Sequence, residues 1–204
     1  MRKTDPRVIR TRQMLCDALV ATILEKGYDA TSIQDITEQA GLRRATFYLH
    51  YRDKEELLVS MMHDTVDELI EKMRISPQDI LTPEVRRVGE VITFTHVQKN
   101  ADLYRAILSG QGAAEITRSV REHMAAGIRE RCFLDRSESD MPIPVEILAN
   151  YMAAVKLNMI IWWLEQGMPY TPEQMAEMCT RLLLNGASGI FEASSVPRYA
   201  ADSA

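Results

Sequence analysis

The 204-residue sequence has few cysteines, few aromatic residues and none of the motifs of the common enzyme classes. Its three cysteines, Cys16, Cys132 and Cys179, are an odd number without CxxC spacing. This favours buried free thiols in a reducing compartment over a disulfide framework. The histidines are isolated and lack the spacing of metal ligands. The sequence therefore predicts no metal and no cofactor.

Catalytic motifs are also missing, since no Ser/His/Asp order, glycine-rich phosphate loop or pair of carboxylates stands out. We therefore predict that the protein is not an enzyme. No segment alternates apolar and polar residues as a strand would, whereas apolar residues recur at helical spacing between glycines and prolines. With 46% hydrophobic residues, the chain can bury a substantial core. The fold expected is all-α.

A membrane or secretory location is disfavoured. The basic N-terminus lacks the apolar run of a signal peptide. The one long apolar run, residues 147–164, carries Lys156 and Asn158 near its middle. A lysine there costs about 2.5–3.5 kcal/mol on insertion scales, so a buried helix of a cytoplasmic protein is expected.

Charge is divided unevenly along the chain. Residues 1–54 hold ten basic and seven acidic residues, whereas residues 55–204 hold 14 basic and 22 acidic residues. The net charge is −5, but the basic excess lies at the N-terminal end. This places the attraction for a polyanion in the first quarter of the chain.

Residues 31–58 have the layout of a helix-turn-helix. A helix expected over residues 5–26 precedes them and ends at Gly27; Ser32 and Asp35 then form a capping pair, a turn follows at Gly41, and a further helix begins at Asp53. We predict a helix-turn-helix domain over residues 1–54 and an effector-binding and dimerisation domain over residues 55–193. Residues 55–73 would be a linker helix, and residues 194–204 a tail.

The short helix after Gly41 would enter the major groove of DNA. Arg43 and Arg44 can bind guanine or phosphate, and Thr46 can contact a base or a thymine methyl group. The hydroxyl groups of Tyr48 and Tyr51 can reach phosphates, although Tyr51 could equally be a core residue. The remaining phosphate contacts expected from this layout are Lys54, at the start of the next helix, and Thr31, Ser32 and Gln34, at the start of the bracing helix.

These residues resemble the DNA-binding region of the TetR family of bacterial transcriptional regulators. The resemblance is carried by Ile33, Ile36, Ala40, Gly41, Thr46, Phe47, Tyr48, His50, Tyr51 and the Lys-Glu-Glu-Leu-Leu run from Lys54. It implies a double-stranded DNA operator as partner and a dimeric repressor released by a small-molecule effector. The family's contact positions correspond here to Gln34, Arg44, Ala45, Thr46, Tyr48, His50 and Lys54. His50 could also be a surface residue without a role in DNA binding.

The C-terminal part suggests a dimer interface and an effector pocket. The last helix places apolar and small residues on one face, which favours a homodimer through Met175, Met178, Leu182, Leu183, Gly186, Ala187 and Ile190. Aromatic, methionine and polar side chains suit an adaptable cavity or a plain helical core; they are Phe94, His96, Tyr104, Met124, Tyr151, Met152, Asn158 and Trp162.

Residues 107–113 and 160–178 resemble a C-terminal variant of the same family. One known member of that variant group acts by protein–protein contact in dihydroxyacetone kinase regulation. A regulator controlled by a protein partner therefore remains the alternative to one controlled by a small molecule. A DNA-independent adaptor of the same fold is a further alternative, which the basic N-terminal end disfavours.

Overall fold

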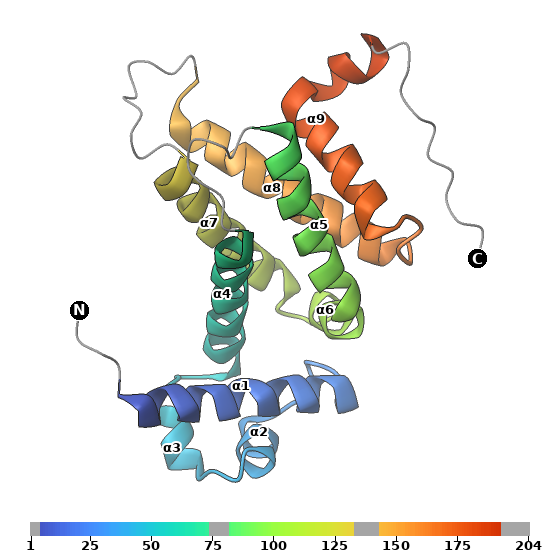
Figure 1. The fold of residues 1–204 in the computed structure, drawn as a ribbon. Coiled ribbons are helices and arrows are strands. Elements are labelled where there is room, and N and C mark those ends of the chain that lie inside the picture. The colour runs from blue at the N-terminus through green and yellow to red at the C-terminus, as the bar shows by residue number, and fades with distance from the viewer. Residues whose placement is uncertain (1–4, 74–81, 133–142, 193–204) are drawn as a thin grey trace. The chain divides into compact units, whose positions relative to one another are not determined.

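The computed structural model describes residues 5–73, 82–132 and 143–192, and within these ranges it contains nine helices and no strand (Figure 1). The all-α prediction is confirmed. The predicted tail, residues 194–204, lies outside the described residues. The helices are α1 (Pro6–Lys26), α2 (Ile33–Gln39), α3 (Arg44–Tyr48), α4 (Lys54–Met73), α5 (Pro83–Lys99), α6 (Ala101–Leu108), α7 (Ala113–Cys132), α8 (Val145–Glu165) and α9 (Pro172–Glu192).

The chain divides into two compact units. The first unit contains Met1–Asp64 and Asp102–Val120, and the second contains Thr65–Ala101 and Arg121–Ala204. The first unit therefore extends beyond the predicted division at residue 54. It also includes α6 and the beginning of α7, which no local sequence pattern associates with a helix-turn-helix.

The first three helices pack around a small apolar core. Leu15, Leu19 and Ile23 of α1, Ile36 of α2 and Phe47 of α3 are all at most 1% exposed. In Figure 1, α2 and α3 lie on the same side of α1. This packing is needed because helices of seven and five residues are too short to be stable alone.

The start of α2 is fixed by polar contacts. The backbone N–H of Asp35 donates to Oγ of Ser32, and the backbone N–H of Ser32 donates to Oδ2 of Asp35, which is the predicted capping box. Lys26 forms an ion pair of 2.6 Å with Asp35. Hydrogen bonds from Lys26 and then Ser32 hold the pKa of the Asp35 carboxyl well below its usual range. The end of α1 and the start of α2 are thereby joined.

The loop between α1 and α2 contacts the turn between α6 and α7. The backbone N–H of Gln111 donates to both carboxylate oxygens of Asp29, at 3.0 and 3.2 Å. Gly110 lies so close to this loop that a Cβ atom would stand 2.9 Å from Cδ1 of Tyr28 and 3.1 Å from Oδ1 of Asp29. These contacts explain why residues 102–120 belong to the first unit.

The second unit is built around α5, α8 and α9. Helices α5 and α9 pack side by side, as Figure 1 also shows. Phe94 of α5 and Trp163 of α8 are both fully buried and meet edge to face, with ring centroids 5.3 Å apart. Beside them, Lys156 of α8 forms an ion pair with Glu90 of α5, whose side chain is 3% exposed. The carboxylate of Glu90 is therefore buried with a charged partner.

The turn between α6 and α7 offers a direct test of this packing. Replacing Gly110 with alanine should destabilise the protein by about 1–3 kcal/mol, because the new methyl group overlaps the ring of Tyr28. Gly112 is a matched control, since a Cβ atom there would meet its nearest neighbours at 3.6 and 3.7 Å, which is ordinary contact. Chemical denaturation of both variants checks the prediction. Equal stability of Gly110→Ala and Gly112→Ala would contradict the close approach.

Candidate nucleic-acid interface

Helix α3 presents a polar and aromatic face to solvent. Arg43, Arg44 and Ala45 are exposed at its start, and Tyr48 is 50% exposed at its end. The opposite face carries the buried Phe47. Thr46 and His50 are half-buried. Five residues of this segment are predicted DNA contacts, and all lie on or beside one accessible surface: Arg43, Arg44, Ala45, Thr46 and Tyr48.

Arg44 and Tyr48 hold each other in place on that face. One terminal nitrogen of the Arg44 guanidinium donates to the Tyr48 hydroxyl at 3.3 Å, and Cζ of Arg44 lies 5.9 Å from the centroid of the ring. Tyr48 also packs edge to face on Phe47, at 5.6 Å between centroids. The remaining guanidinium hydrogens stay available for the paired acceptors of a guanine edge or a phosphate.

Leu49 is an accessible residue that the sequence did not indicate. It directly follows α3 and is 82% exposed, more than any other large apolar side chain described. An apolar side chain is typical of the core, but here Phe47 and Tyr51, two residues away on either side, occupy the buried positions. An exposed leucine beside the predicted DNA contacts can contact a thymine methyl group or a sugar.

The three residues expected to bind phosphate at the start of α2 differ in accessibility. Gln34 is exposed and donates to Glu38 at 2.8 Å, and Ser32 is exposed but occupied with the capping box. Thr31 is only 2% exposed, and its hydroxyl donates to the carbonyl of Gly27 at 2.8 Å. The prediction for Thr31 is therefore corrected, because its hydroxyl serves the loop after α1.

Tyr51 belongs to the core of the first unit. It is 4% exposed, its ring lies 6.1 Å from that of Phe47, and the guanidinium of Arg12 stands 5.5 Å above it. Burial raises the pKa of its hydroxyl, which also forms a hydrogen bond with Ser60. The prediction of a phosphate contact is corrected here too, and the alternative of a core aromatic holds.

Lys54 is turned toward the protein. Its ammonium donates to the backbone carbonyls of Tyr28, Thr31 and Asp29, at 2.6, 2.7 and 3.3 Å. Burial lowers the pKa of Lys54, while the nearby charge of Asp29 acts in the opposite direction. This geometry differs from the phosphate contact expected for an exposed lysine at a helix start.

The predicted pocket residues do not gather around one cavity. Phe94 and Met152 are buried, and Met124 packs on a cluster formed by Ala125, Ala149 and Ala153. By contrast, Tyr151 is 49% exposed, Trp162 is 39% exposed and Asn158 is also exposed. The last three therefore do not line an internal site of the second unit, because they lie on the outward face of α8.

The other two predicted pocket residues are partly buried. His96 of α5 is half-buried, and burial lowers the pKa of its imidazole. Tyr104 of α6 belongs to the first unit, where burial raises the pKa of its hydroxyl to about 12. A role of His96 and Tyr104 in ligand binding remains a prediction.

The predicted interface residues of α9 also fall into different environments. Met175 is fully buried within its own unit, so it is a core residue and no part of an accessible face. Met178, Leu182 and Leu183 are half-buried. Gly186 adopts a φ of 64° and interrupts the helix, a conformation that glycine accepts without strain. The side chains of Ala187 and Ile190 lie outside the described residues.

The packing of α1, α2 and α3, with the polar face of the short third helix exposed, is the arrangement of a helix-turn-helix DNA-binding protein. Two family models agree: that for bacterial regulatory proteins of the tetR family matches residues 15–61, and that for a transcriptional regulator C-terminal region matches residues 91–185. The chain belongs to the TetR family of transcriptional regulators.

One curated relative is similar in sequence, and solved structures are similar in fold. An uncharacterized HTH-type transcriptional regulator of Bacillus subtilis (strain 168), YxbF, is 26% identical over 178 residues, which is 86% of this chain and 45% of that protein. The chain thus matches less than half the length of this relative. A TetR-family regulator from Syntrophomonas wolfei str. Goettingen has a similar fold, with a TM-score of 0.66, 18% identity, and coverage of 93% of this chain and 99% of that one.

Two further solved structures are similar in fold. One is the dihydroxyacetone kinase operon activator DhaS, with a TM-score of 0.61, 19% identity, and coverage of 86% of this chain and 95% of that one. The other is FadR from Bacillus subtilis in complex with stearoyl-CoA, with a TM-score of 0.58, 20% identity, and coverage of 85% and 98%.

Replacing Arg44 with glutamine tests the exposed face of α3. Because Arg44 is exposed, the change should leave thermal stability unaltered while weakening DNA binding. If Arg44 binds a phosphate, the slope of log affinity against log salt should fall by about 0.9 per protomer. If it binds a guanine, discrimination at one base pair should fall by about 1–3 kcal/mol. Lys72→Gln, on an exposed ion pair of α4, is the control, and indistinguishable binding by both variants would contradict the assignment.

Proposed function

We propose that the protein is a dimeric transcriptional repressor that binds a palindromic operator and is released from it by a small-molecule effector. The observation that carries the DNA contact is the exposed face of α3, where Arg43, Arg44, Ala45 and Tyr48 are accessible together. Gln34, Thr46 and His50 flank this face as further contacts, and Ser32 supports it through the α2 cap. Two copies would place their α3 helices in successive major grooves, roughly 34–36 Å apart.

The outward face of α8 supports the dimer. Ile147, Tyr151 and Trp162 are 60%, 49% and 39% exposed, and their spacing places them on one side of the helix. Among the described residues, only Val145–Glu165 is long and apolar enough to cross a membrane, and 28% of its apolar 18-residue window is buried. We propose that a second copy covers this apolar face. A twofold interface of this kind would be consistent with the palindromic operator proposed above.

The effector is proposed from the relatives and from the apolar interior of the second unit. FadR from Bacillus subtilis has been solved with stearoyl-CoA, so fatty acyl-CoA is the first ligand class to examine. Phe94, Met124 and Met152 are the apolar residues in the interior of this unit, and an acyl chain would have to displace part of their packing. The alternative, control by a protein partner, rests on the resemblance of residues 107–113 and 160–178 to a family variant with a member that acts by protein–protein contact.

Selection of duplexes from a random-sequence library by the unaltered protein tests the function. We expect enrichment of a palindrome whose two halves are one helical turn apart, because two α3 helices must bind together. Acyl-CoA of increasing chain length is then added to the complex, and release is followed by fluorescence anisotropy. Absence of any enriched duplex would refute the DNA-binding role. Enrichment without release by acyl-CoA would refute only this effector class.

Introducing a charge on the α8 face tests the dimer. Tyr151→Glu should shift the protein from dimer to monomer in sedimentation velocity, since an unpaired carboxylate cannot be buried at an apolar interface. Gln98→Glu, at an exposed position of α5, adds the same charge elsewhere in the second unit and should leave the dimer intact. If Tyr151→Glu remains a stable dimer, the α8 face is not the interface, and the two copies meet through another surface.

A further inference from the structure

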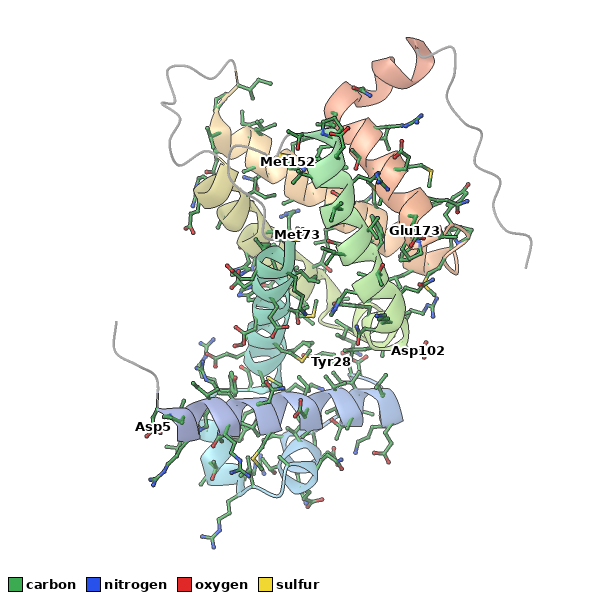
Figure 2. The ribbon with its side chains drawn as sticks, in the orientation of Figure 1. Asp5, Tyr28, Met73, Asp102, Met152 and Glu173 are labelled. Carbon is green, nitrogen blue, oxygen red and sulfur yellow. The ribbon has the colours of Figure 1, made fainter. Side chains whose placement is uncertain are left out.

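Lys54 closes a loop in the chain through its ammonium group. The three hydrogens of an ammonium match three acceptors, and here the carbonyls of Tyr28, Asp29 and Thr31 supply them. The aromatic ring of Tyr28, a residue labelled in Figure 2, lies 4.4 Å from the same nitrogen. We call the three carbonyls of Tyr28, Asp29 and Thr31 together with the Tyr28 ring the Lys54 cradle. Tyr28 itself is 5% exposed, so the cradle is partly removed from water.

The closed loop contains the whole DNA-facing structure. Between Thr31 and Lys54 lie α2, the turn at Gly41 and α3. Thr31 immediately precedes Ser32, the cap of α2, and Lys54 is the first residue of α4. A bond from Lys54 to the carbonyl of Thr31 therefore fixes the two ends of the helix-turn-helix against each other.

The cradle is also held from its other side. Asp29 contributes its carbonyl to Lys54, and its carboxylate accepts from the N–H of Gln111 in the turn between α6 and α7. Phosphate binding by Lys54 would break its three carbonyl contacts in exchange for one ionic contact. It would also leave the carbonyl of Thr31 without the donation from Lys54, which is costly for a partly buried group, whereas the carbonyl of Tyr28 would keep the bond from the N–H of Thr31 at 3.2 Å.

We propose that Lys54 is a positioning residue, which holds the ends of the helix-turn-helix together so that α3 meets DNA in one orientation, and that it is not a phosphate contact. This proposal rests on the DNA-binding function proposed above. It predicts that geometry, and not positive charge, is the property required at this position. A compact ammonium can point three donors at three converging carbonyls, whereas the planar guanidinium of arginine cannot.

Two substitutions separate the alternatives, with Lys72→Met as a matched control on an exposed ion pair. Lys54→Arg keeps the positive charge but loses the three converging hydrogen bonds to the carbonyls. Lys54→Met loses both the charge and the hydrogen bonds. Each variant is measured for melting temperature and for binding to a duplex selected by the unaltered protein. Binding to an unrelated duplex and the salt dependence of both affinities are measured as well. The unrelated duplex reports binding that needs phosphates but no fixed register.

We expect both Lys54 variants to melt at lower temperature and to lose at least about tenfold in affinity for the selected duplex, the equivalent of losing one hydrogen bond to a charged group. Binding to the unrelated duplex and the salt slope should stay unchanged. The proposal is overturned if Lys54→Arg binds and melts like the unaltered protein while Lys54→Met reduces the salt slope by about 0.9 per protomer. Failure to select any duplex would instead refute the DNA-binding function.

A measurement on the unaltered protein covers the case in which neither variant folds. In ¹H–¹⁵N spectra, an ammonium bonded to three carbonyls exchanges its protons slowly and gives its own signal, which exposed lysines do not. We expect one such signal, assigned to Lys54, in the free protein and again in the complex with the selected duplex. Its absence from the free protein, or its loss on binding DNA, would overturn the proposal.

Discussion

The burial of Phe47 is the interaction on which the exposed face of α3 depends. Helix α3 has five residues and no side-chain cap, so its backbone hydrogen bonds alone cannot maintain it. Phe47 is fully buried, and its ring contacts those of Tyr48 and Tyr51. With Phe47 fixed inward, the helical period places Ala45 on the opposite side of α3, and Arg44 and Tyr48 are exposed beside it. The exposed face of α3, which we propose binds DNA, thus depends on one residue in the core.

Much of this architecture could be predicted from sequence, because it is determined locally. Helical spacing, the Ser32–Asp35 capping box and the turn at Gly41 each depend on residues a few positions apart, and the structure contains all three. The burial and hydrogen bonding of Thr31, Tyr51 and Lys54 could not be predicted in this way. Each depends on an acceptor or neighbour brought close by folding, such as the carbonyl of Tyr28, 26 residues before Lys54.

The second unit shows a different limit of sequence patterns. Helix α8 is apolar on nearly every side, so no periodicity distinguishes its buried face from its exposed face. Met152 and Tyr151 are neighbours of similar apolar character, yet one is 7% and the other 49% exposed. Lys156 likewise gave no sign of its partner, Glu90, which lies on another helix. Only tertiary packing assigns these residues to core, ion pair or surface.

The buried pair of Glu90 and Lys156 and the Lys54 cradle use charge in the same way. Burying a charged group costs free energy, and a nonpolar replacement of equal volume is often as stable. What a charged group adds is direction, because its hydrogen bonds are satisfied in one arrangement of the helices and unsatisfied in others. In the first unit this selects one arrangement of α4 against the loop that leads into α2. A protein that must read one DNA sequence benefits from such restriction, since its specificity depends on where α3 stands and not only on which side chains it carries.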